Sequence, residues 1–504
     1  MSKQTVLLFC LAVAASALCA MAKDQSSDDN RSRPDTRPVR QTPPRGPQGA
    51  FLTDVPVHLL DIILGRPTAT SVTLSVLCYD DAKAYVAYGT QKDDLAIRTE
   101  AMEFQKGEPR EVLLDRLKPD TRYYYQLKSD ATNEPFTGGE NRGTFHTQRP
   151  AGSTFVFTVQ ADSHLDENTS PELYRRMLAN VQADSPDFHI DLGDTFMTGK
   201  YPDRDSAAKQ YLAQRYYFGL IGHSAPVFLV IGNHDGEEAS KNGGCEADGL
   251  AVWSCKQRKR YFSNPVPDGF YTGNAEPQPY AGQIQDYYAW EWGDALFVVL
   301  DPYWYSLVNK GGSAPWNMTL GKSQYDWFAR TLCASKAKYK FVFIHQLTGG
   351  LDQGGRGGAE AATRYEWGGH EKDGKDTFAR NRPGWEKPIH NLLVENRVTI
   401  VFHGHDHFFA RQELDGVIYQ LVPQPSQRNC QSHHTAEYGY GKGEFYPSSG
   451  HIRVRVSHEQ VDVDYVRAAL GQNMHRYGVV NGQSSYSYTC GTHLDKNDKT
   501  PHVE

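Results

Sequence analysis

Two histidines close a hydrophobic run between Ile400 and Phe409, IVFHGHDHFF, and they are the first residues at which we expect chemistry. The β-branched and aromatic residues predict a strand, and Gly404 lets the backbone turn where that strand ends. His405 and His407 follow two residues apart, so both imidazole rings can face one pocket and bind a metal ion. A single pair of histidines also occurs at protein surfaces and in hydrogen-bonded cores, so other segments must support this interpretation.

Four further runs of strand type end in residues that can bind metal ions. These runs and the side chains that follow them are 154–160 with Asp162 and His164, 188–192 with Asp194, 227–231 with Asn233, and 341–344 with His345. Strands that alternate with helical stretches such as 171–183 predict an α/β domain, whose ligands bind at the carboxyl ends of the strands. Taken singly, the aspartates could cap or close loops, the asparagine could form a turn and the histidine could lie in the core. The ordered series DxH, GD, GNHD, H and GHxH instead predicts one shared site.

This ordered series resembles the motifs of the calcineurin-like metallophosphoesterases over residues 155–468. The resemblance implies an α/β two-sheet sandwich flanked by helices, in which a metal-bound hydroxide attacks a phosphate ester. It also implies two ligand groups and a bridge: Asp162, His164 and His407 for one ion, Asn233, His345 and His405 for the other, and Asp194 between them. Two divalent ions bring four positive charges and the two aspartates return two negative ones, so the site suits a phosphate anion.

The resemblance extends to purple acid phosphatase-like proteins, but two positions depart from the purple enzymes. Those enzymes carry glycine where His164 stands, and they have a metal-binding tyrosine where this chain has Met197. A thioether cannot replace the phenolate that binds ferric iron. We therefore expect two divalent or mixed-valence ions, drawn from zinc, manganese and iron, without the purple ferric centre.

The GNHD motif also contains the candidate proton donor. His234 is not an implied metal ligand, so its ring can face the substrate and protonate the leaving group, and we expect Asp235 to orient it. Asn233, the metal ligand before it, is also a candidate substrate contact.

A Gly-rich segment from Gly349 to Gly374 follows His345 and is a candidate specificity loop. Within it, Arg364 and His370 are candidate substrate contacts. An ordinary surface loop without a role in substrate binding would explain the same glycines.

Three segments of different composition precede residue 151. Residues 1–22 predict an export signal, because a lysine precedes an apolar run that ends in a small-residue cleavage pattern. Residues 23–50 are rich in Asp, Ser, Arg and Pro and predict a disordered leader. Residues 51–150 predict an all-β sandwich with a corner tyrosine, Tyr123, and this segment resembles a fibronectin type III domain.

The remaining chain divides into a predicted catalytic domain, 151–470, and a C-terminal extension, 471–504. We expect the runs 416–422, 451–457 and 460–467 to complete the second sheet of the sandwich, and the residues after 471 to be irregular. Six of the eight cysteines lie after the export signal, and an oxidising compartment favours disulfides. Cys245 and Cys255 are the expected pair, because the loop between them is short.

The composition excludes some functions. With 504 residues, 39% of them hydrophobic, and a net charge of −7, the chain is an ordinary soluble protein without an evident basic patch for nucleic acid. We expect a secreted or periplasmic enzyme without a transmembrane anchor after signal cleavage, acting on a small phosphorylated substrate; its oligomeric state stays open. Monoesters are favoured, and diesters or nucleotides are alternatives. A non-catalytic adhesion protein that uses the fibronectin-like module is the competing class, but it predicts lost ligands, and none is lost.

Overall fold

The described residues of the computed structural model belong to one compact unit. They are residues 50–136, 143–240, 245–307, 315–352, 354–428, 434–471, 474 and 478–491. The predicted export signal and all of the predicted leader except Ala50 lie outside these ranges. No helix within the described ranges is long and apolar enough to cross a membrane.

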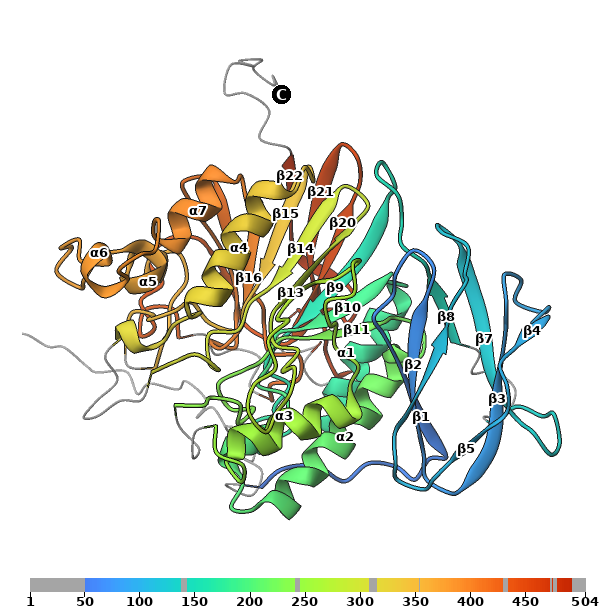
Figure 1. Ribbon diagram of the computed structural model, residues 1–504. Helices are drawn as coiled ribbons and strands as arrows, with labels where there is room; N and C mark the ends of the chain where they lie inside the picture. The colour runs from blue at the N-terminus through green and yellow to red at the C-terminus, as the bar shows by residue number, and fades with distance from the viewer. Residues whose placement is uncertain are drawn as a thin grey trace, which may run out of the picture. The chain divides into compact units, whose positions relative to one another are not determined.

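The N-terminal region, from Leu60 to His146, consists of strands joined by turns and loops (Figure 1). One sheet has the strand order β1 (Leu60–Gly65), β2 (Val72–Cys78) and β6 (Arg110–Leu114). The other has the order β4 (Ile97–Arg98), β3 (Ala82–Gly89), β7 (Arg122–Ser129) and β8 (Gly143–His146), with β5 (Met102–Phe104) paired to β3. The hydroxyl of the buried Tyr123 accepts a hydrogen bond from the Lys118 amide at 2.9 Å, as in a tyrosine corner. The prediction of an all-β N-terminal region is confirmed.

A six-stranded sheet, here called the first sheet, carries the earliest of the predicted motifs. Its order is β11 (Val227–Leu229), β10 (Phe188–Asp191), β9 (Phe155–Gln160), β20 (Gly450–Val456), β21 (Gln460–Arg467) and β22 (Ser484–Gly491). The strands β9, β10 and β11 are parallel, so their carboxyl ends meet at one edge.

An eight-stranded sheet, the second sheet, carries the later motifs. Its order is β12 (Thr272–Gly273), β13 (Tyr288–Trp292), β14 (Ala295–Val299), β15 (Tyr339–Phe343), β16 (Ile400–His403), β18 (Val417–Leu421), β17 (Phe409–Leu414) and β19 (Glu444–Tyr446). The strands β14, β15, β16 and β18 are parallel.

The two sheets pack through an aromatic core. The ring of Phe157 on β9 lies 5.1 Å from that of Phe297 on β14 and 5.4 Å from that of Phe341 on β15. Helices pack against both sheets (Figure 1): α1 (Pro171–Ala183), α2 (Arg204–Gly222) and α3 (Leu250–Tyr261) contribute to a cluster beside β11, whereas α4 (Lys322–Ala334), α5 (Tyr365–Gly368) and α7 (Ile389–Glu395) contribute to one beside β14 to β16. Short helices occur at η1 (Thr198–Lys200), η2 (Pro315–Asn317), η3 (Ala361–Thr363) and α6 (Phe378–Asn381). The predicted two-sheet sandwich with flanking helices is confirmed.

The predicted helix over 171–183 shows how local sequence sets an element. The side chain of Ser170 accepts a hydrogen bond from the Leu173 amide, and Pro171 is preorganised for the first helical turn. Leu173, Met177 and Val181, spaced four residues apart, form the buried face. Replacing such a cap with alanine costs about 1 kcal/mol.

Three predictions about the later chain are wrong. The strands after the last histidine divide between the sheets, since β18 joins the second sheet whereas β20 and β21 join the first. Residues 484–491 form β22 and are not irregular, because their alternating small and large residues suit a half-exposed strand beside β21. Cys245 and Cys255 are both free; the sulfur of Cys255, buried on α3, lies 3.9 Å from the Ile284 carbonyl oxygen.

Candidate metal centre

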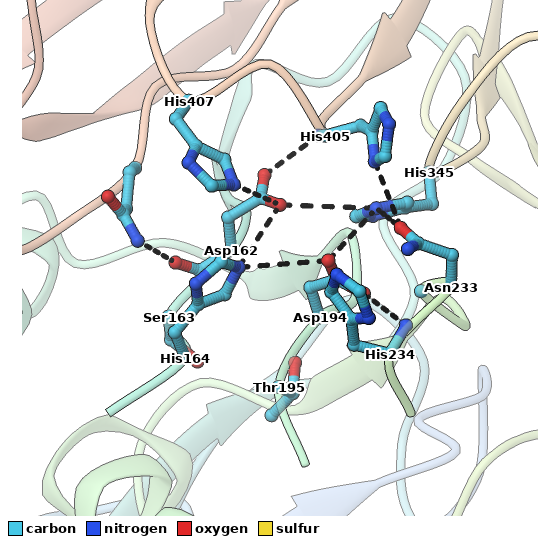
Figure 2. Close-up of polar contacts among 12 residues, drawn as sticks. Asp162, Ser163, His164, Asp194, Thr195, Asn233, His234, His345, His405 and His407 are labelled. Carbon is cyan, nitrogen blue, oxygen red and sulfur yellow. Dashed lines mark hydrogen bonds and ion pairs between the residues drawn. The ribbon is translucent and has the colours of Figure 1, made fainter. Parts of the chain in front are cut away.

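All seven side chains that the sequence predicts as ligands lie together where the edges of the two sheets meet (Figure 2). Asp162 and His164 follow β9, Asp194 follows β10 and Asn233 follows β11, so the first sheet provides these four. The second sheet provides His345 after β15 and His405 and His407 after β16. The strands are buried and rigid, and the ligands stand on the short loops just beyond them.

The first group consists of Asp162, His164 and His407. Asp162 Oδ1 lies 3.6 Å from His164 Nε2 and 3.4 Å from His407 Nε2. Asp162 is fully buried, whereas the His407 side chain is 34% exposed, so this group opens to solvent on one side.

The second group consists of Asn233, His345 and His405. Asn233 Oδ1 lies 3.1 Å from His345 Nε2 and 2.9 Å from His405 Nδ1. Asp194 lies between the groups, because its Oδ2 is 3.7 Å from His164 Nε2 and 3.5 Å from His345 Nε2. The structure thus contains two adjacent clusters of potential ligands, Asp162 with His164 and His407, and Asp194 with His345 and His405, and this arrangement suggests a dinuclear metal site.

Left-handed backbone is concentrated in these loops. The φ angles are 59° at Asp162, 47° at His164, 54° at Asp194, 76° at His405 and 68° at His407. Such angles are unfavourable for residues other than glycine, and they persist only where the surrounding structure enforces them. Five of the seven predicted ligands therefore share a strained conformation that turns their side chains toward one point.

Two glycines make room for the ligands. A side chain on Gly404 would place its Cβ 2.8 Å from Asp162 Oδ2, and one on Gly232 would lie 2.4 Å from Asp194 Oδ1. Both distances are shorter than van der Waals contact, so these motif positions require glycine.

The outer nitrogens of three histidines are held by acceptors, and this determines which nitrogen faces the centre. His164 Nδ1 donates to Asp166 Oδ2 at 3.0 Å, His345 Nδ1 to the Leu192 carbonyl at 2.8 Å, and His405 Nε2 to the Gly354 carbonyl at 2.8 Å. A carbonyl oxygen only accepts, so the opposite ring nitrogens of His345 and His405 carry lone pairs that point inward. The Asp166 carboxylate favours the same arrangement for His164.

The centre contains buried polar atoms that lack a hydrogen-bond partner. Among the described residues, Asp162 Oδ1 and His164 Nε2 are buried without a hydrogen bond. Leaving a buried polar atom unsatisfied costs roughly 1–3 kcal/mol. An inward carboxylate oxygen beside an inward imidazole lone pair is the donor set that a divalent transition metal requires, so the residues fit metal ions.

The electrostatics of the centre favour positive charge. Burial alone would raise the pKa values of Asp162 and Asp194, but the neighbouring imidazoles hold both below their ordinary range. Burial likewise opposes a charged His345, but Asp194 and Asp162 raise its pKa to about 9. A proton and a metal ion compete for the same lone pair, so both effects describe a site that attracts cations.

Asp235 has a different role from the one predicted. Its carboxylate accepts hydrogen bonds from four backbone amides, those of Asp194, Thr195, Phe196 and Gly232, at 2.7–3.1 Å. No recorded bond joins it to His234, so the prediction that Asp235 orients His234 is wrong. Asp235 instead holds the loop that carries Asp194, because both of its oxygens are used by that loop and by Gly232.

Two buried glutamines on α2 also support the ligand loops. Gln210 Nε2 donates to the carbonyl oxygens of His164 and Thr195, and Gln214 Nε2 donates to Ser163 Oγ and to the same Thr195 carbonyl. The spacing of four residues places both amides on one face of the helix. We did not predict this support from the sequence, although two glutamines on a buried helical face were the available signal.

His234 lies beside the bridging carboxylate. Its backbone amide donates to Asp194 Oδ1 at 2.8 Å, and its partly buried ring lies 6.5 Å from the ring of His164. Burial lowers the pKa of His234 to about 4, and the positive charge of Lys200 acts in the same direction against Asp194. The ring is therefore neutral near pH 7 in the absence of an anionic ligand.

The structure does not bring Arg364 and His370 to the metal centre. Arg364 Nη1 donates to the Glu371 carbonyl, and His370 Nδ1 donates to the Gly368 carbonyl. These contacts are local to the α5 segment, and no recorded contact within the described residues joins either side chain to a predicted ligand. The same Gly-rich segment instead contacts the centre through Gly354, whose carbonyl oxygen accepts a hydrogen bond from His405 Nε2.

Comparison with known proteins identifies the family. The family model of the calcineurin-like phosphoesterases matches residues 155–409, which is half of the chain and runs from the start of β9 to the start of β17. The chain belongs to the calcineurin-like phosphoesterase family. As a calcineurin-like phosphoesterase it is a metal-dependent hydrolase of phosphoric esters, and the ligand clusters lie at the ends of the strands that the family model spans.

Solved structures share the fold of this calcineurin-like phosphoesterase. A structure of PhoD matches with a TM-score of 0.55 and 15% identity, covering 84% of this chain and 87% of that one. The purple acid phosphatase PPD1 from yellow lupin (Lupinus luteus) seeds matches with a TM-score of 0.52 and 14% identity, covering 86% of this chain and 74% of that one. No curated protein matches the sequence. At these identities the structures establish similarity of fold.

Proposed function

We propose that the protein is an exported phosphoesterase with two metal ions that hydrolyses phosphate monoesters. The observation that carries the proposal is the set of inward-facing atoms at the centre that could bind a metal ion and that make no hydrogen bond within the described residues, above all Asp162 Oδ1 and His164 Nε2. Asp162, His164 and His407 would bind one ion, and Asn233, His345 and His405 the other. Asp194 would bridge the two, because its Oδ2 lies at similar distances from both groups.

The ligand types favour zinc, manganese or iron. Imidazole and carboxylate ligands suit all three metals, and the chain offers no phenolate at the position of Met197. Met197 is buried and contributes no oxygen, so a bound iron would lack tyrosine ligation at this position.

The charge of the centre favours monoesters over diesters. When bound, such a pair of ions lowers the pKa of a water molecule and neutralises charge on a phosphoryl group. Asp162 and Asp194 cancel only part of the ionic charge, so a site that remains positive attracts the dianion of a monoester more strongly than the monoanion of a diester. Diesters and nucleotides are the alternatives for the same site.

His234 is the proposed proton donor. Its ring has no recorded hydrogen-bond partner within the described residues, and its backbone is fixed to Asp194. A bound phosphate dianion would raise the pKa of this imidazole from about 4, which is what a donor near neutral pH requires. An alkyl leaving group needs the proton most, because an alkoxide is a stronger base than a phenoxide.

A matched pair of histidine variants tests this role. His234→Ala should retain both ions and lower kcat by about 10²–10⁴-fold on alkyl phosphates, with a smaller loss on aryl phosphates. His370→Ala is the control, since its exposed ring bonds to the loop carbonyls of Thr363 and Gly368, and it should behave as the wild type. Equal losses on both ester classes in His234→Ala would remove the proton-donor assignment.

Metal analysis and a substrate panel test the function as a whole. Protein reconstituted with zinc, manganese or iron should hold about two ions per chain and hydrolyse monoesters faster than diesters. A metal-loaded protein that hydrolyses neither class would favour the non-catalytic adhesion role. Export is proposed from residues 1–22, and the mature N-terminus of protein recovered outside the cytoplasm would reveal whether that segment is removed.

A further inference from the structure

Residues 354–357 lie directly against the GHDH loop. Besides the bond from His405 Nε2 to the Gly354 carbonyl, Gly357 donates its amide to Asp406 Oδ2 at 3.0 Å. Arg356 Nη1 donates to Asp406 Oδ1 at 2.9 Å. Asp406 is the residue between His405 and His407 in the sequence. Arg356 therefore contacts the immediate chain neighbour of a predicted ligand of each ion.

The guanidinium of Arg356 is held in one orientation. Asp406 binds one of its terminal nitrogens, and its central carbon lies 4.0 Å from the centre of the Tyr438 ring, so the planar group stacks on that ring. The arginine side chain is 30% exposed. Within the described residues, Nε and Nη2 have no recorded hydrogen-bond partner, so this fixed cation keeps donors for another group.

The carboxylates near Arg356 already have other donors. Asp406 Oδ2 accepts hydrogen bonds from the Gly357 amide and from the Tyr440 hydroxyl, the latter at 2.8 Å. Asp352 Oδ1 accepts the amides of Gly354 and Arg356 at 2.9 and 3.1 Å. Both anions are therefore stabilised by the loop itself, and Arg356 is not required as the sole partner of either.

Arg356 lies on the outer side of the His405 ring. His405 Nδ1 faces Asn233 at the centre, and Nε2 on the opposite side of the ring faces the Gly354 carbonyl. Arg356 is next to Gly354 on that outer side, because a Cβ at Gly354 would be 3.5 Å from Arg356 Nε. A phosphoryl group at the ions would occupy the inner position. A guanidinium that contacted the same substrate would therefore meet a group farther out, which on an ester belongs to the leaving group.

We propose that Arg356 selects substrates whose leaving group carries a second anionic group, a carboxylate or a further phosphate. This inference rests on the proposed function, since it assigns a specificity residue to the same site. A guanidinium with free Nε and Nη2 donors matches the two oxygens of such an anion. Tyr438 and Asp406 preorganise it, so little side-chain freedom is lost when the anion binds.

The test compares phenyl phosphate with 3- and 4-carboxyphenyl phosphate, which differ by the second anion. The metal-loaded wild type should have a higher kcat/KM for at least one carboxylated ester. Arg356→Gln retains an amide donor toward Asp406 but removes the charge, and it should lower kcat/KM on the preferred carboxylated ester by about 10–100-fold, with a much smaller change on phenyl phosphate. A Tyr440→Phe variant removes a different bond to Asp406 and should leave the ratio of the two substrates as in the wild type.

Three outcomes would overturn the inference: no preference in the wild type, equal losses on both substrates in Arg356→Gln, or the same change of ratio in Tyr440→Phe. If Arg356→Gln does not fold, Arg356→Lys provides the second variant, since it keeps the charge but not the planar fork and should lose part of the preference. The affinities for carboxyphenylphosphonates and for phenylphosphonate, measured by calorimetry, test recognition without hydrolysis, because a phosphonate has no ester bond between the ring and phosphorus. An inert protein that still distinguishes these phosphonates through Arg356 would refute the proposed hydrolysis while supporting the recognition.

Discussion

The two sheets supply different chemistry to the same centre. The first sheet provides every predicted oxygen ligand, from Asp162, Asp194 and Asn233, together with one imidazole, whereas the second sheet provides predicted imidazole ligands only. Each predicted ion would thus be held by both sheets. Metal binding should therefore link the strand ends of the first sheet to those of the second sheet. Loss of an ion from one group would remove one of these links.

The two sheets also differ in how they hold their ligands. Around the first sheet, side chains do this work: Asp166 supports His164, Asp235 supports the Asp194 loop, and glutamines of α2 support both. On the second sheet, His345 and His405 are held by backbone carbonyls of Leu192 and Gly354. Substitution of a supporting side chain can therefore loosen the first group directly, whereas the supports of His345 and His405 change when a loop moves.

The largest effect is expected at the residue that serves both groups. Asp194→Asn removes a negative charge that lies between two imidazoles, so both ions should bind weakly. Activity should fall by more than the roughly 100-fold typical of losing a residue that only hydrogen-bonds to a metal ligand. Metal content and kcat/KM measure this, with Asp184→Asn, at the C-terminal end of α1, as an isosteric control outside the centre. A variant that keeps both ions and near-normal activity would show that Asp194 does not bridge.

An intermediate effect is expected at Asp166, whose carboxylate supports His164 in the way that backbone carbonyls support His345 and His405 on the second sheet. Asp166→Ala leaves His164 Nδ1 without its acceptor, so affinity for one ion should drop by about 10–100-fold while the other ion stays bound. Metal titration followed by activity would separate the two sites. Asp166→Asn retains an acceptor and should lose less. Equal loss of both ions in Asp166→Ala would mean that the groups do not bind independently.

The smallest effect is expected far from the ions, at the C-terminal end of α1. Asp184 accepts from His451 Nε2 and from Arg453 Nη1, both at 2.8 Å. Burial raises its pKa, but the bonds to His451 and Arg453 outweigh burial and hold the pKa below 3.8. Asp184→Asn should destabilise the protein by about 1–2 kcal/mol near neutral pH without changing metal content.

The sign of the pH dependence follows from that lowered pKa. The ionised Asp184 stabilises the folded state fully above the unfolded value of 3.8, and this contribution is lost as the pH falls through the lower folded value. The difference in free energy of unfolding between the wild type and Asp184→Asn should therefore be constant above that value and shrink in acid. Denaturant unfolding at several pH values measures it. A difference that grows in acid would contradict the assignment.

Hydrophobic runs that end in ligand-type residues were enough to predict the strands of the centre and its family. The run before Asp162, for example, is β9, and the helix predicted from its spacing is α1. The parallel order of β9 to β11 makes sequence-distant loops neighbours, which is why the motif series could be interpreted as one site. The roles of Asp235 and of Arg364 could not be predicted, because each depends on which backbone group happens to lie opposite the side chain.

By itself the sequence determined the types and order of the candidate ligands, the period of each strand and the family, because these depend on local residue pattern. Only the tertiary structure decided which nitrogen of each histidine faces inward, which loop carries Arg356 to the GHDH segment, and how the last strands divide between the sheets. The physical reason is the sequence separation of the interacting residues. The periodicity of side chains along a strand or helix depends on residues that are close in the sequence. A hydrogen bond such as that from His405 to Gly354 joins residues 51 positions apart, and its geometry exists only after the sheets have packed.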